Sequence, residues 1–356
     1  MFNNSLDSTS SRIYAHHLVR TDAGERNLKE FDTSLDSRDL DVSNVSFSQV
    51  ETEEHEDEEE EEIEATQSFR EVNIDSVKEL RAEISEICSS LSDTLREMFK
   101  QMSIVGAVDE THAMVQYSTS MYMIDVDVIA KEFFYQSVIF SLGNLGSFKL
   151  KNEDAEPISI IYLMQLAPEE IRPSEDDSLD AAKYLLSQSE MLWDYFSIDI
   201  KSEEDGTIVI SSLPSIIGGF LPALEGLPDF LLSLLMRVDW SEEKPCIEGI
   251  ARCLADFFTS TISIVKRLDE KDEEEEEKGE EDEEMREIPD DDDDESDEPE
   301  EDVEQQDRPW KRLICNYLLP ACKAKLIPPE SFKDEEAGVI TRVVDLHDLY
   351  KVFERC

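Results

Sequence analysis

Two runs of acidic residues divide this 356-residue chain and restrict where a folded core can form. Residues 51–64 carry 11 acids and no Lys or Arg, and residues 269–307 carry 27 acids against three basic residues. Such blocks of like charge repel one another and bury almost no apolar surface. We therefore predict a disordered acidic leader over 1–68 and a disordered acidic insert over 269–307. The core is then built from residues 69–268 and 308–356.

The formal net charge of -54 limits the partners that this chain can bind directly. The phosphate backbone of DNA is bound by Lys and Arg, which release its counterions, and the sequence has no dense basic stripe. We therefore expect no strong direct DNA binding. Acidic tracts can instead contact basic proteins, so an acidic scaffold or chaperone for basic nuclear proteins is one alternative function.

The six cysteines do not form the pattern of a disulfide framework. Two pairs, Cys246/Cys253 and Cys315/Cys322, are spaced by seven, which puts each pair two helical turns apart and too far to bridge. We expect them to be small buried hydrophobes rather than metal ligands. No apolar secretory segment opens the chain. The longest apolar region, 208–236, is interrupted by prolines and acids. An intracellular, reducing compartment and no membrane span are expected.

Apolar periodicity predicts an α+β fold, with a small sheet and packed helices followed by an inserted, mostly helical half. Apolar residues from Val77 to Met98 recur every three or four positions, which is typical of one face of a long helix. β-Branched and aromatic residues then indicate strands over 103–108 and 112–126. Asp127 is expected to cap a helix that ends at Gly143.

The second half is predicted to be mostly helical, with Ser174 capping its first helix. The expected segments are helices within 173–198, 217–240, 246–268 and 308–326, the last kinked by Pro320, and a strand over 338–344 that returns to the first sheet.

No arrangement of residues in the sequence indicates catalysis. No histidine of the expected core lies at a metal-ligand spacing from a cysteine or another histidine, and the common nucleophile, phosphate-loop and zinc-protease motifs do not occur. We expect no catalytic site of its own. Metal-dependent activity of the isolated chain would favour the remaining alternative, a cryptic metal hydrolase.

Several blocks resemble, in order, the C-terminal domain of the eukaryotic MutL homologue 1 family of DNA mismatch repair proteins. They include "LPALEGLPDFLL", "RVDWSEEKPCIEGI" and the terminal "DLHDLYKVFERC". The likeness covers about residues 69–356, and the family's N-terminal ATPase motifs do not occur in the sequence. The resemblance implies a nuclear, non-catalytic heterodimerisation subunit in DNA repair, whose α/β half pairs with a second MutL-type subunit that nicks DNA.

The resemblance also implies that the C-terminal tail reaches the partner's metal-dependent nicking site. Phe353 would anchor the tail, Glu354 or Arg355 would pair with the partner, and the thiolate of Cys356 would be a soft ligand for a zinc shared with the partner. The alternative is that the tail finishes a sheet edge and the cysteine is incidental. The string "DETHAMVQY", residues 109–117, is not a nicking motif, because its spacing is wrong and it is predicted to be turn and strand.

A second implied site takes peptides from mismatch-repair exonucleases and other repair factors. The "VDWSEE" block makes Trp240 an aromatic anchor and Glu243 part of an acidic rim for a basic peptide. The alternative is a helix end in which Trp240 belongs to the core and the acids are solvated.

Overall fold

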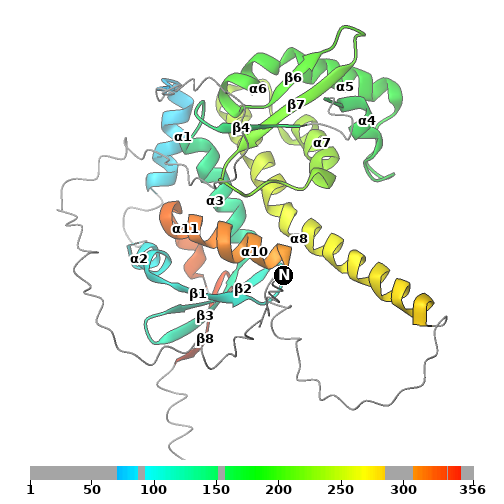
Figure 1. Cartoon of the computed structure of the whole chain (residues 1–356). Helices are drawn as coiled ribbons and strands as arrows, with labels where there is room; N and C mark the ends of the chain where they lie inside the picture. Colours follow the sequence, from blue (N-terminus) through cyan, green and yellow to red (C-terminus); the bar gives the residue numbers. More distant parts are fainter. Residues whose placement is uncertain (1–69, 87–92, 151–156, 285–307, 335, 346–356) are drawn as a thin grey trace, which may run out of the picture. The chain divides into compact units, whose positions relative to one another are not determined.

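A computed structural model describes one compact unit within residues 66–356, which contains two antiparallel sheets and the helices packed against them (Figure 1). The described residues are 70–86, 93–150, 157–284, 308–334 and 336–345. The mixed helix and sheet composition confirms the predicted α+β class. The expected leader, residues 1–68, lies outside the described residues.

The first sheet has the strand order β1-β2-β3-β8 and is antiparallel throughout. Its strands are β1 (Ser103–Ala107), β2 (His112–Tyr117), β3 (Ser120–Asp125) and β8 (Ile340–Asp345). Ile124 lies opposite Ile340, so the C-terminal strand joins the N-terminal hairpin, as predicted. The four-stranded sheet therefore combines three strands from the start of the described unit with one strand from its end.

Helix α3 (Val126–Phe140) packs on the inner face of this sheet and is the centre of the core. Asp125 caps it by accepting a hydrogen bond from the backbone N of Val128 at 3.0 Å. The predicted cap, Asp127, is wrong by two residues, because β3 runs directly into the helix. Phe134 is fully buried and packs against the rings of Phe220 and Phe258, which ties α3 to the second half.

The predicted long N-terminal helix is seen as two helices, α1 (Asp75–Glu86) and α2 (Asp93–Gln101), and the residues between them are outside the description. Val77, Leu80 and Ile84 of α1 are buried, as the helical spacing predicts. Helix α1 contacts α3 and α8, so the start of the unit is held by both halves.

A second sheet lies in the half that the sequence predicted to be mostly helical. Strand β7 (Ile208–Ser215) pairs with β4 (Gly146–Lys149), β5 (Ile158–Ser159) and β6 (Asp199–Ser202). The strand was missed because seven of its eight residues are buried, so it lacks the alternation of a half-exposed strand.

The helices around this second sheet largely follow the predicted pattern. Ser174 caps α5 (Glu175–Ser187), and α6 (Ser189–Phe196) follows after Gln188. Two further helices complete this half: α4 (Ile160–Gln165) and α7 (Leu227–Arg237). A 3₁₀ turn, η3 (Leu224–Gly226), directly precedes α7. None of the helices in the described part of the chain combines the length and apolar character that crossing a membrane requires.

Helix α8 (Glu243–Glu284) runs through the middle of the unit and packs along α3 and α7. We expected a loop from residue 269, whereas the helix continues through the first part of the acidic run. Lys266 contacts Glu110 at 2.5 Å, and Arg308 contacts Asp269 at 3.4 Å. The first ion pair joins α8 to the turn before β2, and the second joins the start of the acidic run to the residue that follows it. Residues 285–307 lie outside the described residues.

After the insert the chain forms α10 (Pro309–Arg312), a π-helical turn (Leu313–Leu318), α11 (Leu319–Lys325) and a 3₁₀ turn (Glu330–Lys333). The π turn ends two residues before Pro320, where a kink was predicted. Buried Gln136 of α3 donates to the carbonyl of Ile327 at 2.8 Å and accepts from its backbone N at 3.0 Å. This paired contact fastens the segment after α11 to the central helix.

Candidate dimerisation face

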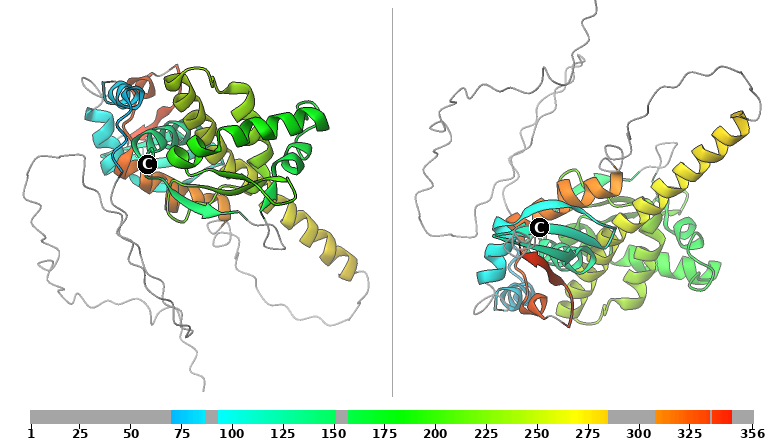
Figure 2. Two further views of the ribbon diagram at one scale, coloured as in Figure 1. Left: turned by 90° about the horizontal axis from the view of Figure 1, so that it is seen from above. Right: turned by 90° about the horizontal axis from the view of Figure 1, so that it is seen from below.

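The first sheet has two unlike faces because successive side chains of a strand point to opposite sides. Ala113, Val115 and Ile124 point inward and are fully buried. The described helices that contact the sheet lie on this inner side, and no described helix lies over the other side (Figure 1). In the view from below, the strands lie in front of the helices (Figure 2). We call the second side the outer face.

Methionines dominate the centre of the outer face. Met114 lies directly opposite Met123, and Gln116 lies opposite Met121. On β8, Thr341 pairs with Met123 and Val344 pairs with Met121, which extends the strip to the sheet edge. Methionine is unbranched and polarisable, so a methionine strip can adapt to a partner surface.

The edge strands leave further apolar surface open to solvent. Val105 lies at a bulge in β1 and Val343 lies at an irregular position of β8, and their exposed fractions are 55% and 53%. Exposed apolar side chains at the two edge strands of a sheet that also carries a methionine strip are compatible with a protein interface. Sequence analysis did not single these residues out, although the alternation of methionines in 112–126 was a usable signal.

The start of the C-terminal tail is fixed at the edge of the first sheet. Asp345, the last described residue, accepts hydrogen bonds from the hydroxyls of Ser120 at 3.1 Å and Thr119 at 3.4 Å. The predicted tail residues lie outside the described residues: Phe353, Glu354, Arg355 and Cys356. Their contacts therefore stay a prediction, but the strand from which they continue is anchored.

The predicted peptide site lies where α1, α7 and α8 meet, and its two residues have different partners. The indole N of Trp240 donates to the carbonyl of Leu234 at 3.0 Å, and its ring lies edge-on to Tyr184. Glu243 is exposed and accepts a hydrogen bond from Ser76 at 2.6 Å. Trp240 is thus partly buried and packed against the core, while Glu243 faces solvent.

An acidic ridge on α1 adjoins Glu243. Lys244 contacts Glu83 at 2.5 Å and Glu79 at 3.4 Å, while the side chains of these glutamates are 55% and 63% exposed. The structure thus adds two carboxylates from α1 to the acidic rim. Sequence analysis could not supply them, because α1 and α8 are far apart in the chain.

Residues 109–117 form a turn and a strand, as predicted. Asp109 accepts hydrogen bonds from the backbone N atoms of Thr111 and His112, each at 2.7 Å. Partial burial acts to raise the pKa of Asp109, but the hydrogen bonds from Thr111 and His112 outweigh it and leave the pKa below its ordinary value. The carboxylate therefore stabilises the turn that begins β2.

The seven-spaced cysteines of α8 are buried, as predicted. Burial raises the pKa of the Cys253 thiol to about 11 and also raises the pKa of Cys246. Such thiols stay protonated and behave as small hydrophobes. The described residues contain no group of three or more His, Cys, Asp or Glu side chains that could hold a metal ion.

Residues 73–356 match the family model described as the C-terminus of DNA mismatch repair protein Mlh1. With the α+β fold, this match defines the chain as the C-terminal domain of a MutL-type mismatch repair protein. The chain belongs to the Mlh1 C-terminal family.

Three relatives support this assignment. DNA mismatch repair protein Mlh1 of Dictyostelium discoideum is 32% identical over 296 residues, covering 82% of this chain and 30% of that protein. DNA mismatch repair protein MLH1 of Saccharomyces cerevisiae is 25% identical, covering 80% and 34%. The putative MutL protein homolog 1 of Schizosaccharomyces pombe is 26% identical, covering 99% and 46%. The chain thus spans less than half the length of each relative.

Proposed function

We propose that this chain is a non-catalytic heterodimerisation subunit of a nuclear MutL-type mismatch repair complex. The observation that carries the proposal is the outer face, where Met114, Met121 and Met123 form an apolar strip that no described helix covers. Burying apolar surface between two subunits is the main favourable contribution to such an association. The partner is a second MutL-type subunit with a nicking site.

The anchored strand β8 supports a role for the tail in trans. The tail continues from Asp345 at the edge of the sheet that carries the outer face, so a partner bound to that face would lie near the point where the tail begins. Phe353 would bind an apolar recess of the partner, and Cys356 would add a thiolate to a zinc held mainly by the partner. The chain itself would carry no complete active site.

Co-expression with the nicking-type MutL subunit from the same source tests the pairing. Size-exclusion chromatography with mass determination should give a stable one-to-one complex. A chain that stays monomeric beside a folded partner contradicts the proposal. Deletion of Cys356 should leave the one-to-one complex intact and abolish metal-dependent nicking by the partner. Unchanged nicking would contradict the proposed role of the tail, whereas the proposed pairing through the outer face would still stand.

The acidic scaffold is tested by removing acidic sequence that lies outside the described residues. Because Asp269 pairs with Arg308, the deletion should cover 51–64 and 285–307 and leave residues 266–271 in place. We expect the heterodimer to form normally after these deletions. Loss of partner binding would instead favour the scaffold function.

A second proposed function is the binding of a basic peptide from repair exonucleases or other repair factors. Its support is the exposed carboxylate of Glu243 beside the exposed glutamates of α1. Glu243→Gln should weaken such binding several-fold, measured by fluorescence anisotropy with a labelled basic peptide, and leave the heterodimer unchanged. Glu242→Gln, at the neighbouring exposed glutamate, is the matched control.

A further inference from the structure

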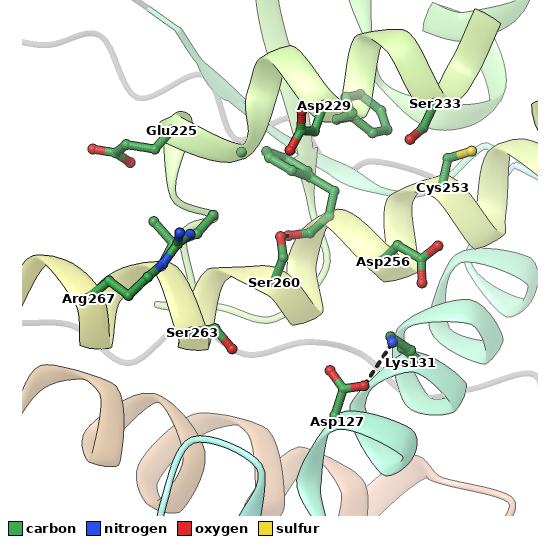
Figure 3. A pocket seen from close by; sticks show the side chains of 14 residues that line it. Asp127, Lys131, Glu225, Asp229, Ser233, Cys253, Asp256, Ser260, Ser263 and Arg267 are labelled. Carbon is green, nitrogen blue, oxygen red and sulfur yellow. Dashed lines mark hydrogen bonds and ion pairs between the residues drawn. The ribbon is translucent and has the colours of Figure 1, made fainter. Parts of the chain in front are cut away.

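A recess with an acidic lining lies between helices α3, α7 and α8 (Figure 3). Its volume is about 460 Å³, which is within the range of small-ligand sites. Its lining comes from the first turns of α3, the start of α7 and the middle of α8. Asp256, in its wall, lies thirteen residues beyond Glu243 on α8, or about 20 Å at 1.5 Å per residue. The recess is therefore separate from the predicted peptide site.

The charges that line the recess do not balance one another. Four carboxylates and two cations line it, and two of the carboxylates have partners within the fold. Asp127 pairs with Lys131 at 2.7 Å, and Asp256 pairs with Arg237 at 2.6 Å. The other two carboxylates, Glu225 and Asp229, belong to neither of these ion pairs.

Glu225 and Asp229 are exposed and form no hydrogen bond or ion pair with any residue that the structure describes. They lie four residues apart where η3 leads into α7. In Figure 3 the side chain of Asp229 lies beside the recess, and the side chain of Glu225 extends outward from η3 at one end of it. Acids at a helix start also stabilise that helix. The pair is consequently free to accept a cation from outside the chain while remaining compatible with the fold.

The base of the recess is apolar and closely packed. The rings of Phe230 and Phe257 are stacked with centroids 4.9 Å apart. Gly226 allows η3 to approach α8 closely, since a Cβ there would lie 3.1 Å from Ile264 and 3.3 Å from Phe257. This contact keeps the two walls at a fixed separation. The recess therefore offers an apolar base below a carboxylate rim.

We infer that this recess receives an Arg or Lys side chain of a partner protein. The aliphatic stem would lie against the apolar base, while the cation would bind beside Asp229, and Glu225 would add negative charge at the end of the recess. Arg267 on the facing wall would restrict the site to a single basic side chain, because a second cation would be repelled. This surface uses neither the outer face of the sheet nor the tail, so it is available in a heterodimer paired through the outer face.

Photo-crosslinking on the full chain tests the inference. The probe is a short, otherwise uncharged peptide that contains a benzophenone amino acid and one arginine. The control probe has citrulline, which has a similar shape and no charge, in place of arginine. Mass spectrometry of the digested chain locates the cross-links. We expect arginine-dependent cross-links within 225–233 and 253–267. Cross-links to the acidic runs would measure nonspecific electrostatic attraction and serve as an internal control.

Two variants decide the outcome. Glu225→Gln with Asp229→Asn should reduce the recess cross-links at least fivefold relative to those in the acidic runs. The matched control, Glu175→Gln with Asp176→Asn in the first turn of α5, should leave them unchanged. Arg267→Gln, at an exposed position, should increase them about twofold, since a repelling cation is removed. Cross-links confined to the acidic runs, or recess cross-links unaffected by the first variant, would overturn the inference.

Discussion

The hydroxyl of Ser120 donates a hydrogen bond to the carboxylate of Asp345 across 3.1 Å, joining residues 225 positions apart in the chain. Ser120 begins β3 and is buried, while Asp345 ends β8. The bond therefore fixes the last described residue to the hairpin at the centre of the first sheet. It also defines the point from which the C-terminal tail continues.

Ser120→Ala should lower the free energy of unfolding by about 1 kcal/mol, because one intramolecular hydrogen bond is lost at a buried site. Urea denaturation of the chain measures the change. Ser331→Ala, at an exposed serine of the last 3₁₀ turn, should change stability by less than about 0.5 kcal/mol. Equal effects of the two substitutions would show that the Ser120–Asp345 bond does not stabilise the sheet.

Met123→Lys should disrupt the heterodimer, because it places a charge at the centre of the outer face where a partner must bury apolar surface. We expect at least a tenfold weaker association, measured by analytical ultracentrifugation of the co-purified subunits. The matched control is Met236→Lys on α7, where the side chain is 74% exposed. If both variants pair normally, the outer face is not the interface.

Gln136→Leu should destabilise the chain by about 2–4 kcal/mol, since it leaves both the carbonyl and the N–H of Ile327 without their partner. Thermal and urea unfolding should both report the loss. Gln101→Leu, at an exposed position of α2, provides the control and should have little effect. A neutral result for Gln136→Leu would mean that water replaces the lost bonds.

Acid should weaken the ion pair between Glu110 and Lys266. The hydrogen bond from Lys266 is the main cause that lowers the pKa of Glu110 in the fold. A carboxyl whose folded pKa is lowered stabilises the protein above its unfolded pKa, near 4.5, and loses that contribution as pH falls through the folded pKa. Because both groups are partly exposed, the contribution at pH 7 is at most about 1 kcal/mol.

Glu110→Gln should consequently reduce stability at pH 7, and the difference from the parent chain should shrink as pH falls below about 4.5. Urea unfolding at a series of pH values measures this convergence. Glu170→Gln, at an exposed glutamate, should leave the pH dependence unchanged. A difference for Glu110→Gln that persists at low pH would contradict the ion-pair explanation.

The sequence alone determined the features that depend on neighbouring residues. The spacing of Val77, Leu80 and Ile84 predicted a helix, because residues three or four apart share a helix face. Ser174 was predicted as a cap because its side chain can accept from a backbone N–H three residues later. The ordered motifs up to Cys356 indicated the family, which the comparison with known proteins confirmed.

Only the tertiary structure decided the features that depend on distant segments. Strand β7 is buried by neighbours on both sides, so its sequence carries no alternation that would separate it from a buried helix. The acidic run continues α8 to Glu284, although its composition favours a loop, because the helix is already formed on α3 and α7. The acidic recess likewise exists only because packing brings η3 beside the part of α8 between Cys253 and Arg267, which lies 28 to 42 positions after Glu225 in the chain.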